Sequence, residues 1–579
     1  MSAKYNNILN APFGAKIRRP QKNGGDGFDD SVRVAFLGGL NEVGKNMTVF
    51  EYCGDMIIVD CGLSFPDSDL LGVDLVIPDF TYVERYKDKV KGIVITHGHE
   101  DHIGGLPYLL DVVDAPIYAT GLTIGLIEGK LEEHGNLNRA KLNIIVPGEE
   151  IDLGKFTVEG IHVNHSIPDS LALAIKCDGG TVVHTGDFKI DTTPIDGSMI
   201  DLARFATLGS EGVLCLMSDS TNAERPGYTE SERRVGESIE RLFPKAENKR
   251  IIVATFSSNI HRVQQIINLS VAAGRRVALS GRSLENVVNK AYDLGYMDIP
   301  EDSVISIDDI RSYSDGEITI ITTGSQGEPM SALKRMSTGE HKHVHITPND
   351  FIIISANPIP GNELTVGKVI DDLMKLGAEV IYNQMYEVHV SGHARQEELK
   401  MIMSLVKPRY FIPVHGEQKH LRSHAAIAES IGIPSKNIII ADNGTCVSMR
   451  QNSVKVDSSI TAGRVFIDGY GVGDVGNMVL RDRKRLSQDG LFAVGIVIDK
   501  ASGELACPVQ IDSRGFIYVK EADELYGKAK ELVTDTLEAR LAGRYDDMAL
   551  RSAIKDALSR FLYERTKRSP MIVSIINYI

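Results

Sequence analysis

The feature that most constrains this chain is a short loop that carries three histidines and an aspartate. His97, His99, Asp101 and His102 follow directly after the apolar residues 92–95, which we expect to form a buried strand. Imidazole and carboxylate groups are the usual protein ligands of zinc. Four such groups on one tight loop cannot all bind the same ion. The pattern therefore predicts two neighbouring metal ions rather than a solvated polar loop.

Four further candidate residues each follow directly after a predicted strand, at Asp60, His165, Asp187 and His415. In a packed sheet such positions can converge on one edge, where they would meet the histidine loop. Asp60 can act from outside the coordination sphere by orienting a ligand histidine or a water. The alternative is that Asp60 is an ordinary turn residue without a role at the metal site. Two metal ions side by side suit in-line displacement at phosphorus.

Length, cysteine usage and charge limit the class of protein. The 579 residues suffice for about three or four domains. The six cysteines are scattered without a CxxC pair, which fits a reducing compartment and argues against a disulfide framework. Without a signal-peptide pattern or a bilayer-spanning apolar stretch, we expect a soluble cytoplasmic protein and no membrane partner. The net charge of −15 counts against a broad nucleic-acid surface but says little about a narrow channel.

The rhythm of predicted strands and helices divides the chain. We expect a flexible arm over 1–30, and over 31–228 a sheet-on-sheet core covered by helices. Residues 229–385 alternate strand and helix, which predicts a doubly wound parallel α/β unit. It interrupts the first domain, because ligand-type histidines resume in 386–455.

The C-terminal part is expected to be a small α+β domain. A polar linker is predicted at 456–462 and the domain itself at 463–579. Residues 463–499 alternate like a sheet, and two amphipathic helices follow at 522–540 and 546–566. Packing or dimerisation is the expected role of this domain.

These residues together resemble the metallo-β-lactamase superfamily and, within it, the beta-CASP nucleases of the ribonuclease J family. The histidine loop is similar to the second superfamily motif, and the first, third and fourth correspond to Asp60, His165 and Asp187. Asp219, His393 and His415 resemble beta-CASP motifs A, B and C. The resemblance implies a metallo-β-lactamase αββα sandwich with an inserted doubly wound α/β beta-CASP domain and a small α+β C-terminal domain.

The resemblance also implies a ligand set for two Zn²⁺ ions per subunit, with Mn²⁺ as a substitute. One ion would be held by His97, His99 and His165, the other by Asp101, His102 and His415, and Asp187 would bridge them. A shared hydroxide would attack an RNA phosphodiester. His393 would protonate the leaving 3′-oxygen or bind a phosphate oxygen. Asp219 and Asp60 are the other residues that the resemblance implies for catalysis.

The implied activity is endonucleolytic and 5′-to-3′ exonucleolytic cleavage of RNA, favouring single strands with a 5′-monophosphate, in mRNA decay and rRNA maturation. The implied assembly is a homodimer or homotetramer, alone or with a paralogous subunit or other RNA-decay proteins. A DNA nuclease or a small-molecule hydrolase on the same metal site is the alternative. An inserted domain over the site favours the nuclease, because a small-molecule hydrolase needs no such clamp.

Two segments are candidates for binding the terminal phosphate. The first offers a hydroxyl, backbone N–H groups and two imidazoles, on residues His389, Val390, Ser391, Gly392 and His393. The second begins a predicted helix at Ser257, Ser258 and Asn259, where either phosphate binding or ordinary helix capping applies.

Two other polar segments are tempting but are expected to be structural. His341, His343 and His345 alternate along the chain, and on a strand they would share one face without a carboxylate partner on that face. We therefore predict no metal site there. The acidic stretch over 67–79 is expected to be a solvated loop rather than a cation site.

Overall fold

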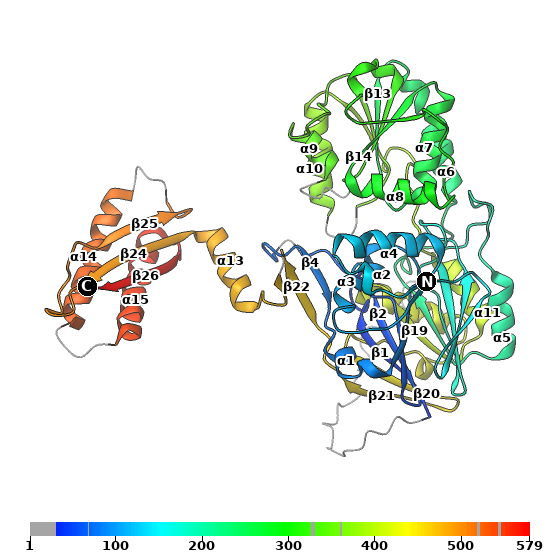
Figure 1. Cartoon of the computed structure of the whole chain (residues 1–579), viewed down its shortest axis with the longest axis horizontal. Helices are drawn as coiled ribbons and strands as arrows, with labels where there is room; N and C mark the ends of the chain where they lie inside the picture. Colours follow the sequence, from blue (N-terminus) through cyan, green and yellow to red (C-terminus); the bar gives the residue numbers. More distant parts are fainter. Residues whose placement is uncertain are drawn as a thin grey trace, which may run out of the picture. The chain divides into compact units, whose positions relative to one another are not determined.

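The computed structural model describes residues 30–67, 69–325, 331–358, 362–469, 471–517, 522–541 and 546–579. The chain divides into two compact units, of which one comprises Met1–Ser64 and Ile77–Arg464 and the other Phe65–Val76 and Val465–Ile579. Figure 1 colours both along the sequence. Nearly all of the predicted arm, 1–29, lies outside the described residues.

The first unit contains a sandwich of two sheets. In the described part of the chain, the larger sheet has the strand order β21 (Ser453–Ser459), β20 (Thr445–Arg450), β1 (Val32–Gly38), β2 (Met47–Tyr52), β3 (Asp55–Val59), β5 (Val90–Val94), β6 (Ile117–Ala119) and β7 (Leu142–Ile144). The smaller has the order β19 (Tyr410–Val414), β12 (Cys215–Asp219), β11 (Gly180–His184), β10 (Leu171–Cys177), β9 (Phe156–His162) and β8 (Glu150–Leu153).

The period of two in each strand explains the layers. On β1, Val34 and Phe36 pack in one core cluster with Leu173 of β10, between the sheets. Ala35 and Leu37 point to the opposite face and pack with the helical side of the larger sheet. Side chains of successive strand residues point to opposite faces, so β1 supplies both layers.

Helices cover the outer faces of both sheets. The larger sheet is covered by α1 (Thr81–Arg85), α2 (Glu100–Ile103), α3 (Leu106–Leu109) and α4 (Gly121–Glu133). The smaller is covered by α5 (Leu202–Glu211), α11 (Gln396–Val406) and α12 (Gln418–Ser430). The predicted αββα sandwich is confirmed.

The inserted domain is a parallel sheet with helices on both faces (Figure 1). Its strands lie in the order β15 (Val304–Ile305), β14 (Arg276–Ser280), β16 (Ile318–Thr322), β13 (Arg250–Ala254), β17 (Asp350–Ile354) and β18 (Glu379–Tyr382). One face packs against α6 (Glu232–Glu240), α7 (Ile260–Ala272) and α8 (Arg282–Asp293), and the other against α9 (Ala332–Ser337) and α10 (Glu363–Lys375). Burial on both faces explains the nearly continuous apolar strands.

The insert contacts the sandwich through α8 and α4. Lys290 of α8 donates to Glu128 of α4 at 2.8 Å, and the hydroxyl of Tyr296 donates to the carboxylate of Asp169. A side chain at Gly125 would lie 2.8 Å from a methyl carbon of Leu294. The two helices therefore approach closely, and the insert is fixed next to the loop that carries His165.

The second unit has a sheet in the order β25 (Gln510–Arg514), β24 (Leu491–Ile498) and β26 (Met571–Tyr578). Phe492, Val494 and Ile496 of β24 are buried in one core cluster with α14 (Ala522–Leu541) and α15 (Asp547–Thr566). The α+β character predicted for this region is confirmed.

Two expectations for this part of the chain differ from the structure. The predicted linker at 456–462 is wrong in part, because β21 continues to Ser459 and pairs with β20. The sheet-like run 463–499 contains β22 (Arg464–Asp468) and β23 (Gly471–Val472), but its middle is the helix α13 (Asn477–Asp489). Charged residues dominate α13, so alternation alone was a weak signal for strand.

The acidic stretch at 67–79 is more than a solvated loop. It runs into the short strand β4 (Leu75–Pro78), and Val73 and Val76 pack with Val475 in one apolar cluster. The carboxylate of Asp74 accepts from the backbone N–H of Gly469 at 2.8 Å. Contacts over nearly 400 positions of sequence cannot be read from local pattern.

Candidate metal centre

The candidate metal centre lies where strands of both sheets end. Asp60 follows β3, His97 follows β5, Asp187 follows β11 and His415 follows β19. Asp60 and His415 have φ angles of 60° and 54°. These values lie in the left-handed region, which residues with a Cβ rarely adopt. Such backbone persists only where surrounding contacts hold it, and it is concentrated at functional sites.

One cluster consists of three imidazoles. Nδ1 of His99 lies 3.1 Å from Nε2 of His97 and 3.2 Å from Nε2 of His165. Burial lowers the pKa of His97 and His165 well below its usual value, and lowers that of His99 to about 4. Neutral ring nitrogens facing one another at this distance fit a shared cation.

A second cluster combines two carboxylates with two imidazoles. Nε2 of His415 lies 3.2 Å from Oδ2 of Asp101, and Nε2 of His102 lies 3.3 Å from Oδ2 of Asp187. The ligand-type atoms of these four residues lie within 4.8 Å of one another. The donor set fits a divalent cation of the zinc or manganese type.

Asp187 reaches both clusters. Besides His102, its Oδ2 lies 3.7 Å from Nε2 of His97 and 3.9 Å from Nε2 of His165, while its Oδ1 lies 3.5 Å from Nδ1 of His415. A carboxylate has two oxygens, so Asp187 is placed to contact ions in both clusters.

The two clusters differ in protonation. Burial lowers the pKa of His102 and His415, but nearby carboxylates, Asp187 first among them, outweigh it. The pKa of His102 is raised well above its usual value and that of His415 to about 10. His415 and His102 in turn hold the pKa of Asp187 well below its usual range, against the effect of burial. A cation entering this cluster would replace protons.

Contacts behind the ligands fix the orientation of the rings. Asp60 accepts from the backbone N–H of Thr96 at 2.8 Å, and its other oxygen lies 2.8 Å from Nδ1 of His102. That contact turns Nε2 of His102 toward Asp187. Nδ1 of His165 lies 2.8 Å from the carbonyl of Gly392 and a Cβ at Gly392 would lie 2.6 Å from the His165 ring. Only glycine fits there.

His393 and Asp219 form a pair beside the second cluster. Nδ1 of His393 lies 2.8 Å from Oδ2 of Asp219, and Oδ1 of Asp219 accepts from the N–H and hydroxyl of Thr221 at 2.9 and 2.8 Å. Burial lowers the pKa of His393, but Asp219 outweighs it and the net shift is upward. The ring of His393 therefore holds its proton more strongly than a free imidazole does.

The segment 389–393 lies beside this pair and is held from several sides. Nδ1 of His389 accepts from Arg262 at 3.0 Å. The hydroxyl of Ser391 accepts from Asn222 at 2.8 Å and from the backbone N–H of His393 at 3.2 Å. Val390 is buried in the core of the insert, so its side chain cannot contact a ligand.

Of the predicted positions 257–259, Asn259 follows the helix-capping alternative. The side chain of Asn259 accepts from the backbone N–H of Arg262 at 3.1 Å and caps α7, which is the capping alternative. Ser257 and Ser283 share a hydrogen bond between hydroxyls at 3.1 Å. Ser258 lies between Ser257 and Asn259 in the sequence, just before α7.

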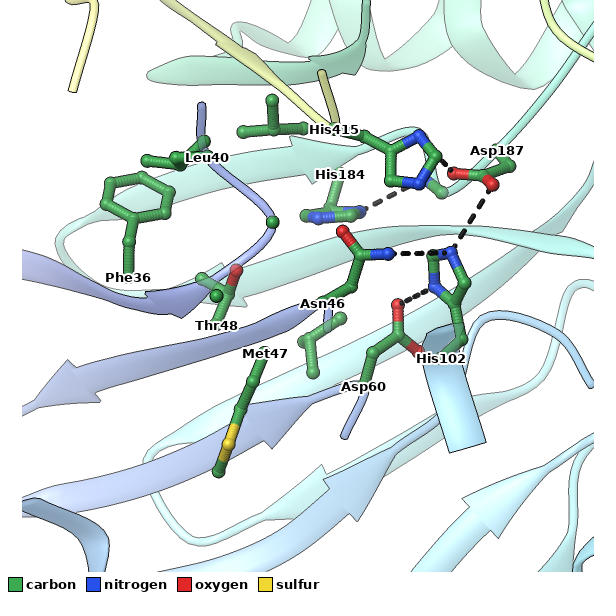
Figure 2. Close-up of a pocket in the computed structure, with 15 residues that line it drawn as sticks. Phe36, Leu40, Asn46, Met47, Thr48, Asp60, His102, His184, Asp187 and His415 are labelled. Carbon is green, nitrogen blue, oxygen red and sulfur yellow. Dashed lines mark hydrogen bonds and ion pairs between the residues drawn. The ribbon is translucent and has the colours of Figure 1, made fainter. Parts of the chain in front are cut away.

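Two residues of the centre were missed by the sequence analysis. Nδ2 of Asn46 lies 3.1 Å from Nε2 of His102 and donates to the carbonyl of Asp101 at 3.1 Å. Nδ1 of His184 accepts from the backbone N–H of Gly186 at 3.0 Å, directly before Asp187. Figure 2 shows both residues beside His102 and Asp187. Asn46 immediately precedes β2 and does not follow a strand, so strand-end placement gave no signal for it.

A small cavity lies behind the second cluster (Figure 2), lined by Asn46, Thr48, Asp60, His102, His184 and His415 among others. Its volume is about 20 Å³, which is enough for one water molecule.

Four domain families match the chain. They are the metallo-beta-lactamase superfamily at residues 40–202, the ribonuclease J beta-CASP domain at 248–373, the Zn-dependent metallo-hydrolase RNA specificity domain at 378–440 and the ribonuclease J C-terminal domain at 478–579. The second and third of these families contain Arg262 and the segment 389–393, respectively.

Similar proteins extend over nearly the whole chain. Ribonuclease J2 of Bacillus subtilis is 43% identical over 548 residues, which cover 94% of this chain and 98% of that protein. Ribonuclease J of Thermus thermophilus is 41% identical over 565 residues, covering 96% and 97%. A crystal structure of a protein of unknown function from Enterococcus faecalis has a TM-score of 0.51 at 15% identity, covering 72% of this chain and 100% of that one, and shares the fold.

Among the described residues, no helix is both long and apolar enough to cross a bilayer. The sandwich, the inserted doubly wound domain and the gathered histidines agree with the domain families and with relatives above 40% identity over most of the chain. The chain belongs to the ribonuclease J family, the beta-CASP ribonucleases of the metallo-β-lactamase superfamily.

Proposed function

We propose that this member of the family is a zinc-dependent ribonuclease with two cations per subunit, and that Mn²⁺ can replace Zn²⁺. It would cleave RNA internally and from the 5′ end, favouring a 5′-monophosphate. The observation that carries the proposal is the position of Asp187, whose carboxylate lies within 3.3–3.9 Å of imidazole nitrogens in both clusters. One shared carboxylate between two donor sets suits a paired metal site.

The ligands would be the residues of the two clusters. His97, His99 and His165 would hold one cation, Asp101, His102 and His415 the other, and Asp187 would contact both. When bound, the cations supply Lewis acidity, charge stabilisation and a water of lowered pKa. Asp60 would act as a positioning residue, because its contact with Nδ1 of His102 directs Nε2 toward Asp187 and a cation beside it.

His393 and Asp219 would handle the leaving group. Nδ1 of His393 is paired with Asp219, so Nε2 is the nitrogen left for the substrate. The upward shift of its pKa keeps a proton on the ring, and that proton can pass to the departing 3′-oxygen or donate to a phosphate oxygen. His393 would therefore serve as the general acid of the reaction.

The terminal phosphate of the RNA would bind at the segment 389–393. Its matched family is described as an RNA specificity domain, and the segment lies beside His165 through Gly392. His389, Ser391 and the backbone N–H groups can donate to phosphate oxygens. Ser257 and Ser258, just before α7, would also bind this phosphate, with Asn259 only capping the helix.

The insert favours a polynucleotide over a small molecule as substrate. It packs on the sandwich beside the loop of His165, through Lys290–Glu128 and Tyr296–Asp169. A cover of this kind can guide a chain but is not needed around a small ligand. We further propose a cytoplasmic homodimer or homotetramer, alone or with a paralogous subunit, that acts in mRNA decay and rRNA maturation.

One assay tests the proposal. RNAs of one sequence with 5′-monophosphate, 5′-triphosphate or 5′-hydroxyl ends, and the matching DNA, are incubated with the protein before and after chelation and after return of Zn²⁺ or Mn²⁺. We expect chelator-sensitive cleavage restored by the metal, with stepwise decay fastest on the monophosphate. Turnover of a lactone with no cleavage of RNA would contradict the proposal, and so would equal cleavage of RNA and DNA.

A further inference from the structure

A buried arginine lies behind the segment that carries His389. Arg262, in the first turn of α7, has 0% of its surface exposed. Its Nε and Nη2 donate to the two carboxylate oxygens of Glu232 at 2.7 and 2.8 Å, and its Nη1 donates to the carbonyl of Ser355 at 2.7 Å. A planar guanidinium bound at three points has one orientation.

The same Nη1 lies 3.0 Å from Nδ1 of His389. A guanidinium can only donate, so Nδ1 must accept, and the proton of the neutral ring is on Nε2. Burial, and then the charge of Arg262, lowers the pKa of His389 well below its usual value. The ring is therefore neutral, in a single tautomer.

The other nitrogen of the ring is available to a ligand. Nε2 lies on the other side of the ring from the nitrogen that contacts Arg262, whereas the carbonyl of Ser355 lies beside the ring and accepts from Arg262. The His389 side chain is only partly buried. The backbone just before the ring is also fixed, because the hydroxyl of Ser355 donates to the carbonyl of Val388 at 2.6 Å. His389 thus presents one N–H from a rigid support.

We propose that Arg262, held by Glu232, is a positioning residue for recognition of the RNA 5′ end. It fixes the His389 ring so that Nε2–H donates to the terminal phosphate. This inference rests on the proposed function, in which the segment 389–393 binds that phosphate. A buried ion pair is weak evidence for stability, whereas a donor with a fixed direction improves recognition by avoiding the cost of ordering it on binding.

The same sheet offers a matched control pair. Arg250 donates to both carboxylate oxygens of Asp350 at 2.7 and 2.9 Å. These two residues begin the parallel strands β13 and β17, whereas Ser355 and α7 follow the ends of the same strands. The control pair therefore has the same chemistry at the opposite edge of the sheet.

The experiment compares decay of 5′-monophosphate and 5′-hydroxyl RNA of one sequence. The enzymes are the wild type, Glu232→Gln/Arg262→Gln, and Arg250→Gln/Asp350→Asn. Each double variant removes both charges, so neither is left buried and unpaired. In Glu232→Gln/Arg262→Gln we expect the preference for the monophosphate to fall about tenfold, mainly through KM. This is the effect expected for one lost hydrogen bond to a charged group. The control pair keeps the preference.

Two further measurements separate positioning from general support. Long-range ¹H–¹⁵N spectra of histidine-labelled protein, assigned with His389→Gln, should show His389 with the proton on Nε2 in the wild type and a mixture of tautomers in Glu232→Gln/Arg262→Gln. His389→Gln keeps an N–H close to the Nε2 position and should retain part of the preference. His389→Asn, whose amide reaches only the Nδ1 position, should not.

Three results would overturn the inference. The first is an unchanged preference in Glu232→Gln/Arg262→Gln while the wild type prefers the monophosphate, which leaves the proposed function intact. The second is an equal slowing of both RNAs in that variant and in the control pair, which would make the arginine merely structural. The third is a wild type that cleaves RNA without regard to its 5′ end, which removes this inference together with the end-phosphate part of the proposed function.

Discussion

Two segments of the chain alternate histidines, at 97–102 and at 341–345, and the structure uses them in opposite ways. In the first segment, each ring keeps a nitrogen for one of the two clusters that Asp187 reaches. In the second, Nδ1 of His341 accepts from the backbone N–H groups of His343 and Val344 at 3.3 and 3.1 Å. Its Nε2 lies 3.1 Å from the hydroxyl of Ser280, so both ring nitrogens are in use.

The comparison teaches that alternating histidines do not make a metal site by themselves. The first segment receives carboxylates from distant strand ends, at Asp60 and Asp187, which orient or complete it. The carboxylate near the second segment is Asp308, 2.9 Å from Nδ1 of His343 and 67% exposed. Solvent screens such a pair, and a single carboxylate there cannot gather the other rings.

The largest difference in metal content and RNA cleavage is expected between the variants Asp187→Asn and Asp308→Asn. Asp187→Asn removes the carboxylate that reaches both clusters, so bound metal should fall and RNA cleavage should drop at least about a thousandfold, beyond the usual cost of an outer contact. Asp308→Asn should change neither. Metal content by elemental analysis and initial cleavage rates measure both. Comparable losses in the two variants would break the comparison.

A smaller loss is expected from the contacts that orient the rings. Asp60→Asn weakens the hold on Nδ1 of His102 and should lower activity or metal affinity about 10–100-fold. Ser280→Ala removes the corresponding contact of His341 and should leave both unchanged. Metal titrations and cleavage rates at saturating metal distinguish affinity from turnover. An Asp60 variant with wild-type values would show that the contact has no orienting role.

Metal binding should release protons from one cluster only. His102 and His415 have a raised pKa and are protonated at neutral pH in the metal-free protein, so a cation must displace their protons. Its affinity should therefore fall as the pH falls, about tenfold per unit for each proton released. His97, His99 and His165 have a lowered pKa and are already neutral. Calorimetry in buffers of different ionisation enthalpy should show proton release in one binding step and little in the other.

The smallest effect on activity is expected at His341. His341→Ala leaves buried partners unsatisfied at Ser280 and at two backbone N–H groups, which should lower the free energy of unfolding by about 1–3 kcal/mol. Metal content and cleavage should stay at wild-type values. Denaturant unfolding at fixed metal concentration gives the stability change. A loss of bound metal in this variant would show that the second segment is a metal site after all.

Much of the centre could be predicted because its residues follow strands. Asp60, His97, Asp187 and His415 each come within a few residues of the end of a strand, and such strands end at common edges of a sheet. The same reasoning could not find Asn46. Asn46 immediately precedes a strand, and its contacts to His102 and Asp101 depend on the register of β2 beside β3.

The fold was predictable where periodicity was strong and less so elsewhere. Continuous apolar strands predicted the inserted parallel sheet, since both of its faces are buried. The helix α13 was missed because most of its residues are charged or polar and none of them is buried. The buried pair of Arg262 and Glu232 joins residues 30 positions apart on two helices, and nothing in the local sequence indicates that they face His389.

The most direct test of the account is a crystal structure with anomalous scattering recorded at the zinc edge. We predict two strong peaks per subunit, one among His97, His99 and His165 and the other among Asp101, His102 and His415, with Asp187 next to both. A map with no peak beside Asp187, or with its strongest peak at residues 341–345, would contradict the account.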